Sequence, residues 1–345
     1  MTSRDHQWAG ALHEHEFDSR ALIDNPLGDP HLRPLYVYTP PAYEAEPQRR
    51  FPTLYVIQGL TGMVEMWRNR KAFQRNVTEQ VDALFADSTT PPAIVVYVDA
   101  FTALGGSQFL DSPATGRYHT YLCDEVVPWV DAEYRTLPAP AHRGIAGKSS
   151  GGYGAMVTPM LRPDLFGGLA SHAGDALFEH AYWSDVREAL RALRDEYDGD
   201  YDAFWTDLRA RPGRPKPADG SLLNVWTMAA CYSADADGTV RLPWHPDGRI
   251  DHAVWDRWLA WDPVRMVPDR ADALRGMRAI WVDAGRSDEF YLDLGAEAFV
   301  AALRQLGITE PTLRVELFDG THSNIEWRYP LALRFLAERL SAGTS

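Results

Sequence analysis

The sequence predicts an α/β protein in which a mostly parallel central sheet is flanked by helices. Short apolar runs rich in β-branched and aromatic residues alternate along the chain with segments of helical periodicity. Several of the runs are continuously apolar, which is typical of parallel strands that are buried on both faces. Right-handed β-α-β crossovers join such strands into an open sheet. With 345 residues, of which 45% are hydrophobic, the chain has enough apolar material for a core of that size.

Strands and helices are expected to alternate outside the middle of the chain. Alternating His and Glu side chains at 13–16 indicate an early strand, which explains them more simply than a metal site does. Further strands are expected at 35–39, 53–57, 93–99, 144–146, 168–171, 279–283 and 313–318. Helical periodicity predicts helices at 73–85, 120–134, 152–161, 294–306 and 330–340. In the helix expected at 120–134, Leu122, Val126 and Val130 recur every fourth residue and so share one face.

Residues 176–275 interrupt this alternation, and we interpret them as an insertion into a core formed by 1–175 and 276–345. They carry seven of the twelve tryptophans, a stretch rich in Pro and Arg, and helical patterns at 183–197, 201–210 and 253–261. Ligands bind beyond the carboxyl ends of parallel strands, so we expect a lid or pocket wall in which Trp255 and Trp258 contact the substrate. The alternative is that the indoles pack only the insertion's own small core.

Charge and composition exclude several classes of partner. A net charge of −14, from 34 basic and 48 acidic residues, argues against nucleic acid, because an acidic surface repels the phosphate backbone. No run approaches the roughly 18 apolar residues that a membrane-spanning helix needs, and residues 1–22 lack the apolar region of a secretory signal. Cys123 and Cys231 are expected to be buried thiols. These features favour a cytoplasmic location and leave the oligomeric state open.

Residues 144–155, G-I-A-G-K-S-S-G-G-Y-G-A, carry the strongest chemical motif of the chain. A phosphate loop would need a glycine at the position of His142, so nucleotide binding is not favoured. The pattern G-x-S-x-G fits around Ser149, between an expected strand and an expected helix. In such an elbow the serine is the nucleophile, and the backbone N–H of Ser150 supplies one oxyanion donor.

A serine nucleophile needs a base and an orienting acid, and in this arrangement the acid precedes a histidine along the chain. The stretch V-D-A-G-R-S-D-E-F at 282–290 offers several carboxylates. Asp288 is favoured because it follows a turn, whereas Asp283 still lies within the expected strand. His322, in F-D-G-T-H-S-N at 318–324, is the only histidine after Asp288, so it is the predicted base.

Loops at other strand ends supply further candidates. Q-G-L-T-G at 58–62 follows a strand, and the N–H of Leu60 would be the second oxyanion donor. His172 and Asp175 follow another strand and are interpreted as part of the pocket wall. The stretch S-A-D-A-D-G at 233–238 lacks the acidic twelfth position of a calcium loop, and we expect neither a metal nor a cofactor.

Taken together, the motifs resemble the putative-esterase family of α/β-hydrolases, which includes S-formylglutathione hydrolase (esterase D), feruloyl, acetyl-xylan and enterochelin esterases and mycolyltransferases. The matching segments are V-Y-T-P-P-A-Y at 37–43, Q-G-L-T-G at 58–62, G-K-S-S-G-G at 147–152, D-L-F-G-G at 164–168, G-R-S-D-E-F at 285–290 and G-T-H-S-N at 320–324. By position, Ser149 corresponds to the nucleophile, Asp288 to the acid and His322 to the base. Gln58 and Lys148 depart from the residues that are common in relatives, and both are expected to border the pocket.

The resemblance implies the α/β-hydrolase fold and a serine esterase that cleaves a small-molecule carboxylic ester or thioester through an acyl-enzyme. An acyltransferase would use the same acyl-enzyme with an alcohol in place of water. A non-catalytic binding protein that keeps the fold is the alternative from another class. The presence of Ser149, Asp288 and His322 together favours an enzyme.

Overall fold

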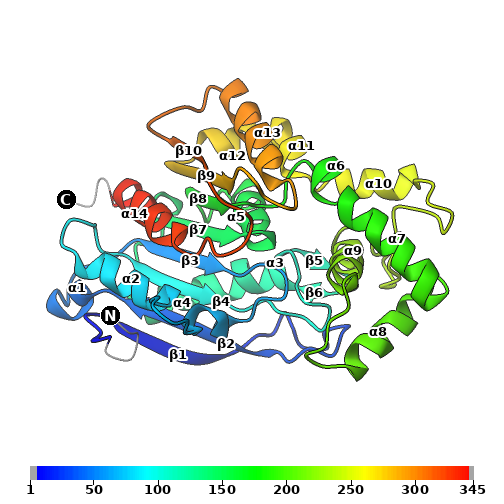
Figure 1. Cartoon of the computed structure of the whole chain (residues 1–345). Helices are drawn as coiled ribbons and strands as arrows, with labels where there is room; N and C mark the ends of the chain where they lie inside the picture. Colours follow the sequence, from blue (N-terminus) through cyan, green and yellow to red (C-terminus); the bar gives the residue numbers. More distant parts are fainter. Residues whose placement is uncertain (1–5, 342–345) are drawn as a thin grey trace.

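The structure is a computed structural model that describes residues 6–341. At its centre is an eight-stranded sheet of order β1-β2-β4-β3-β7-β8-β9-β10 (Figure 1). The strands are β1 Ala11–Asp18, β2 Leu32–Thr39, β3 Thr53–Ile57, β4 Ile94–Val98, β7 Arg143–Lys148, β8 Gly168–His172, β9 Ala279–Gly285 and β10 Leu313–Phe318. In this order, the six strands β4, β3, β7, β8, β9 and β10 run parallel to one another. At one edge, β2 pairs antiparallel with β4, and β1 pairs antiparallel with β2. The prediction of a mostly parallel sheet flanked by helices is confirmed.

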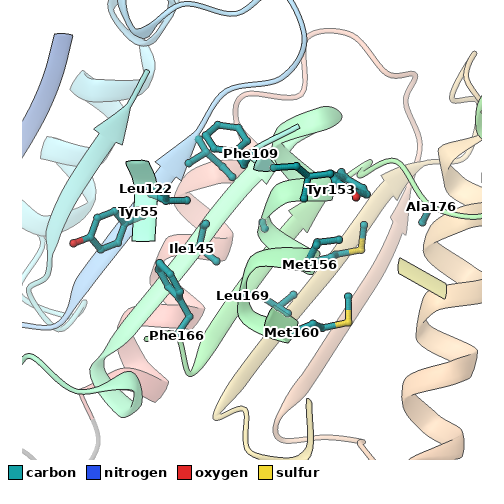
Figure 2. Close-up of a cluster of buried hydrophobic side chains, with 14 of the residues drawn as sticks. Tyr55, Phe109, Leu122, Ile145, Tyr153, Met156, Met160, Phe166, Leu169 and Ala176 are labelled. Atoms are coloured by element: carbon teal, nitrogen blue, oxygen red, sulfur yellow. The ribbon is translucent and has the colours of Figure 1, made fainter. Parts of the chain in front are cut away.

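Helices cover both faces of the sheet, so its central strands are buried along almost their whole length. Alternate residues of β3 point to opposite faces: Leu54 belongs to one apolar cluster and Tyr55 to the other. One face packs on α2 Val77–Ala86 and α14 Arg328–Leu340. The other packs on α3 Tyr118–Thr120, α4 Val127–Glu133, α5 Ser150–Leu161 and α13 Leu292–Gln305. Figure 2 shows this second cluster, in which Leu169 of β8 lies beside Met160 of α5.

The helix expected at 120–134 is divided into three segments. A π-helical turn, Tyr121–Val126, separates α3 from α4, and Pro128 stands in the first turn of α4. Proline has no N–H, so the regular hydrogen-bond ladder cannot continue through this point, and the helix adopts a wider turn before it. Shorter elements of the core are α1 Pro41–Ala45, the 3-10 turns Val64–Arg68 and Pro140–His142, and the two-stranded β5 Asp111–Ser112 and β6 Gly116–Arg117.

Residues 176–275 are mainly helical, and most of this segment lies beyond the sheet (Figure 1). Its elements are α6 Phe178–Ala181, α7 Trp183–Tyr197, α8 Tyr201–Ala210, α9 Asp219–Tyr232, α10 His252–Leu259, α11 Pro263–Met266, the 3-10 turn Pro268–Arg270 and α12 Ala271–Arg275. The patterns that predict α7 and α8 are confirmed. This region has an apolar cluster of its own, yet Met228 and Trp258 belong to the main core. Its division from the rest of the chain therefore stays a prediction.

No helix within residues 6–341 is long and apolar enough to cross a membrane. Cys123 and Cys231 are buried free thiols.

Candidate active site

Ser149 occupies the sharp turn between the end of β7 and the start of α5. Its backbone angles, φ 58° and ψ −127°, lie in a sparsely populated region that costs about 1–3 kcal/mol and persists only where neighbours hold it. Two carbonyl oxygens do so, because the Ser149 N–H donates to His172 O at 3.0 Å and to Ala173 O at 3.1 Å. A side chain at Gly151 would meet Ile57 O at 2.5 Å, which explains the glycine there. The strand, turn and helix have the arrangement that the elbow motif predicts.

His322 and Asp288 form a buried pair beyond the ends of β10 and β9. Nδ1 of His322 lies 2.9 Å from Oδ2 of Asp288, whose side chain is fully buried. The other carboxylate oxygen accepts the backbone N–H of Phe290 at 2.9 Å. Glu289 in turn accepts the backbone N–H of His322 at 2.8 Å. These bonds fix the His322 loop relative to the Asp288 turn.

Ser149 and His322 line one cavity of about 680 Å³. The loop after β3, which contains Leu60, contributes part of the wall, and the first turns of α7 and α9 contribute another part. The α7 and α9 side chains are Ser184, Asp185, Glu188, Asp219, Ser221, Leu223 and Asn224. The cavity therefore connects the elbow to the helical region 176–275.

The backbone N–H groups of Leu60 and Ser150 have no hydrogen-bond partner within residues 6–341. On either side of Leu60 the turn is closed, since Thr61 N donates to Gly105 O at 2.8 Å and Gly62 N donates to Gly59 O at 3.0 Å. Ser150 begins α5, where the first N–H groups of a helix lack partners inside it. Two backbone donors thus remain available beside Ser149.

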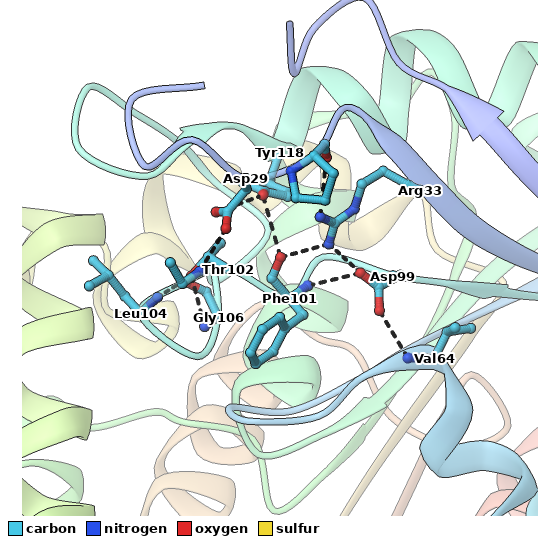
Figure 3. Close-up of polar contacts among 11 residues, drawn as sticks. Asp29, Arg33, Val64, Asp99, Phe101, Thr102, Leu104, Gly106 and Tyr118 are labelled. Atoms are coloured by element: carbon cyan, nitrogen blue, oxygen red, sulfur yellow. Dashed lines mark hydrogen bonds and ion pairs between the residues drawn. The ribbon is translucent and has the colours of Figure 1, made fainter. Parts of the chain in front are cut away.

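A buried polar network braces the loops next to Leu60 (Figure 3). Arg33 pairs with Asp99 at the end of β4, and Asp99 accepts the N–H of Val64 at 2.9 Å. Thr102 closes the neighbouring loop, donating from its hydroxyl to Gly106 O at 2.8 Å. Because this loop supplies the Gly105 carbonyl that holds Thr61, the network helps to fix the backbone around Leu60.

Carboxylates dominate the charge of the cavity lining. Lys148 is the only lysine or arginine among the lining residues, all of which belong to the described chain. The lining carboxylates are Asp175, Asp185, Glu188, Asp219, Glu289 and Glu326. Burial lowers the pKa of Lys148, and the carboxylate of Glu326 opposes that shift most strongly. The interior of the cavity is therefore unfavourable to anionic ligands.

Two of these carboxylates are held by neutral donors. Asp175 accepts hydrogen bonds from Gln108 Nε2 at 3.1 Å, Tyr182 OH at 3.0 Å and Ser150 Oγ at 3.3 Å. Asp185 likewise accepts from the hydroxyl of Ser221 at 2.8 Å and from an amide nitrogen. Burial raises the pKa of both carboxyls, and the hydrogen bonds only partly offset this.

Four residues expected at the pocket lie outside its lining. Gln58 is 3% exposed, and its amide, turned to suit its neighbours, bonds backbone groups of the β4 exit such as Ala100 N at 2.6 Å. His172 is buried against Asp283, with 2.7 Å between Nδ1 and Oδ1. Trp255 packs on another indole, and Trp258 is fully buried with its Nε1 donating to Ser233 Oγ at 2.8 Å. The expectation that these side chains border the pocket is wrong, because each one is packed in the interior or hydrogen-bonded to other buried groups.

Leu60, Lys148, Ser150 and Asp175 line the cavity. Sequence reasoning missed the polar wall from α7 and α9. Asp185 and Glu188 stand three apart on α7, but an exposed helical face offers the same pattern, so no signal marks them. No group of three or more His, Cys, Asp or Glu side chains within residues 6–341 is arranged to hold a metal ion.

Solved structures share this fold at low sequence identity. A ferulic acid esterase is 19% identical, with 96% of this chain and 99% of that chain covered and a TM-score of 0.61. An S-formylglutathione hydrolase from Agrobacterium tumefaciens is 18% identical, covers 97% of both chains and has a TM-score of 0.56. These similarities establish the α/β-hydrolase fold that the sequence motifs predict.

Two curated proteins are similar over part of their length. The uncharacterized protein YbbA of Bacillus subtilis (strain 168) is 24% identical over 181 residues, which are 50% of this chain and 63% of YbbA. An endo-1,4-beta-xylanase/feruloyl esterase of Xylanibacter ruminicola is 28% identical over 120 residues, 35% of this chain and 16% of that protein. The chain thus spans less than two thirds of either relative. The family model described as Putative esterase matches residues 30–336, so the chain belongs to this family.

Proposed function

We propose that this chain hydrolyses a carboxylic ester or thioester through an acyl-enzyme formed on Ser149. The observation that carries the proposal is the shared cavity of Ser149, in its strained elbow, and His322, whose ring is held by the buried Asp288. A serine hydroxyl is a weak nucleophile at neutral pH and needs such a base. Membership of the esterase family supports the reaction class.

In the proposed reaction, Ser149 Oγ attacks the ester carbonyl carbon while its proton passes to Nε2 of His322. Asp288 accepts the Nδ1–H and stabilises the imidazolium that forms. The carbonyl electron pair moves onto oxygen, and the tetrahedral intermediate then collapses by breaking the bond to the alcohol or thiol, which takes the proton from Nε2. Water repeats these steps on the acyl-enzyme and releases the acid.

The oxyanion would be held by the backbone N–H groups of Leu60 and Ser150. Both lack a partner within residues 6–341 and border the cavity beside Ser149. Donors that are fixed before the reaction stabilise the developing charge without reorganisation, and removal of one such donor typically costs about 10²–10³-fold in kcat. The braced loop around Leu60 supplies this rigidity.

The first turns of α7 and α9 would contact the part of the substrate that lies farthest from the scissile bond. Their hydroxyl, amide and carboxylate groups, from Ser184, Asp185, Glu188, Ser221 and Asn224, suit neutral polar or cationic substituents. The excess of carboxylates disfavours anionic esters. In this proposal, the region 176–275 sets substrate choice through these side chains.

A panel of esters tests the proposal. Aryl esters, feruloyl and acetylated sugars, S-formylglutathione and a cyclic siderophore lactone would be assayed with the wild type, Ser149→Ala and the matched control Ser150→Ala. Ser149→Ala should lower kcat by about 10⁶-fold, the loss that is typical when the nucleophile is removed from a Ser-His-Asp triad. Ser150→Ala keeps the backbone donor and should keep most of the activity. Equal losses in two folded variants, or ester cleavage by Ser149→Ala, would contradict the assignment. Acyl transfer to an added alcohol in preference to water would indicate an acyltransferase.

A further inference from the structure

A second buried His–Asp pair lies behind the elbow. Nδ1 of His172, at the end of β8, is 2.7 Å from Oδ1 of Asp283 in β9, and the two side chains are 1% and 0% exposed. The two residues are direct partners across the parallel strands, and Lys148 of β7 is the next partner in the same row. Neither His172 nor Asp283 lines the cavity, so the proposed chemistry gives them no part.

Asp283 is held rigidly in place by further donors. Its second oxygen, Oδ2, accepts Trp281 Nε1 at 2.7 Å and Arg328 Nε at 2.8 Å. Arg328, on α14, also donates to Glu316 of β10 at 2.6 Å. Burial alone would raise the pKa of Asp283, but His172 and then Arg328 outweigh it and hold that pKa below its usual value. The carboxylate is therefore ionised, and both of its oxygens accept hydrogen bonds.

The backbone beside His172 carries the contacts that hold Ser149. The carbonyls of His172 and Ala173 accept the Ser149 N–H at 3.0 and 3.1 Å. Ala173 has a positive φ of 43° and donates its own N–H to the main-chain oxygen of Asp283 at 2.7 Å. Asp283 thus fixes this segment twice, through the His172 ring and through the Ala173 amide.

Packing alone does not account for a histidine at position 172. Nε2 of His172 is buried without a hydrogen-bond partner among the described residues, and the ring packs against Tyr329 in a T-shaped arrangement, with 4.8 Å between centroids. An unsatisfied buried polar atom costs about 1–3 kcal/mol, a penalty that an apolar side chain of similar size would avoid. What the histidine adds is the directional bond to Asp283.

We propose that His172 and Asp283 are positioning residues that hold the end of β8 and, through its carbonyls, keep Ser149 in its strained attacking conformation. The inference rests on the proposed function of Ser149 and deepens it. A strained backbone conformation persists only where neighbouring groups hold it in place. For Ser149, the hydrogen bonds from its N–H to the carbonyls of His172 and Ala173 do this. A displacement of about 1 Å at a reacting atom can lower a rate by about 10²-fold.

The test compares two substitutions of His172, and one of Asp283 with a matched control. His172→Asn keeps a donor near the position of Nδ1, whereas His172→Leu removes it and preserves bulk. Asp283→Asn is matched by Asp82→Asn, because Asp82 of α2 is a buried carboxylate that is bound to a histidine, His6, at 2.8 Å and does not line the cavity. Each variant is titrated with a fluorophosphonate probe, and kcat is calculated per labelled site.

We expect His172→Leu and Asp283→Asn to lower kcat per labelled site, and the labelling rate of Ser149, by about tenfold or more while KM changes less than about twofold. His172→Asn should recover most of kcat, and Asp82→Asn should lose stability without losing kcat per site. If Asp283→Asn does not fold, the His172 pair decides alone. Wild-type kcat and labelling in His172→Leu would overturn the inference only. Failure of the probe to label Ser149 in the wild type would overturn the proposed function, and this inference with it.

Discussion

Replacing Asp288 by asparagine should switch the tautomer of His322. The backbone N–H of Phe290 donates to Oδ1 of Asp288 at 2.9 Å, so an asparagine would turn its carbonyl oxygen to that site. Its NH₂ group would then occupy the position of Oδ2, 2.9 Å from His322 Nδ1. Two donors cannot face each other, so Nδ1 would become the acceptor and the proton would move to Nε2. That nitrogen could no longer accept the proton of Ser149.

The expected loss in kcat/KM is about 10⁴-fold, or about 5.4 kcal/mol, because the wrong tautomer removes general-base catalysis but leaves the oxyanion donors and substrate binding. The assay is steady-state hydrolysis of an activated aryl ester, with folding checked by chemical denaturation. Asp262→Asn is the matched control: Asp262 is fully buried but binds only backbone N–H groups, such as that of Phe178 at 3.0 Å. If Asp288→Asn stays within tenfold of the wild type, the assignment of the acid is refuted.

Three further substitutions test the surroundings of the site. Gly151→Ala places a Cβ 2.5 Å from Ile57 O, so we expect lower stability and lower activity together, measured by denaturation and ester hydrolysis; an unchanged variant would show that the elbow tolerates a side chain. Asp175→Asn should raise the free energy of unfolding more at pH 8 than at pH 4. Burial raises the pKa of Asp175 in the folded state, so the native protein binds the proton more tightly and loses stability as the pH rises above about 3.9. A pH dependence equal to that of the wild type would contradict this. Trp258→Ala should lower the free energy of unfolding by about 3–5 kcal/mol and change small and large esters by one common factor, since the indole is fully buried outside the cavity. A selective effect on large esters would instead favour contact with substrate.

Local signals are sufficient to locate the elbow and much of the sheet. The sequence ranges expected for β3 and β10, and for α7 and α8, coincide with those of the structure. These elements have continuous apolar runs or a strong amphipathic pattern, both of which depend on neighbours in the chain. The elbow is equally local, because the glycine two residues after Ser149 is required by steric contact with β3. The order of acid and histidine then selects the loops of Asp288 and His322, whose catalytic roles stay predictions.

Helix α9 shows where local periodicity fails. Ten of its fourteen residues are buried, so apolar side chains surround it and no single face stands out. The pattern of a helix buried on several sides resembles that of a buried strand or an apolar loop. Its position depends on packing against α7, α10 and β5, which lie outside its own segment of the chain.

The motifs in the sequence specify the nucleophile elbow, the strand-end loops and the family, since each rests on residues a few positions apart. Only the tertiary structure decides which side chains face the cavity. Trp258 and Gln58 are directed into the packed interior, whereas Asp185 and Ser221, which are 36 positions apart, meet at the cavity wall. The type of a side chain indicates that an indole favours burial and that a buried carboxylate needs hydrogen-bond donors. It does not indicate which residues surround the indole or donate to the carboxylate. That choice depends on how separate helices pack against the ends of the sheet.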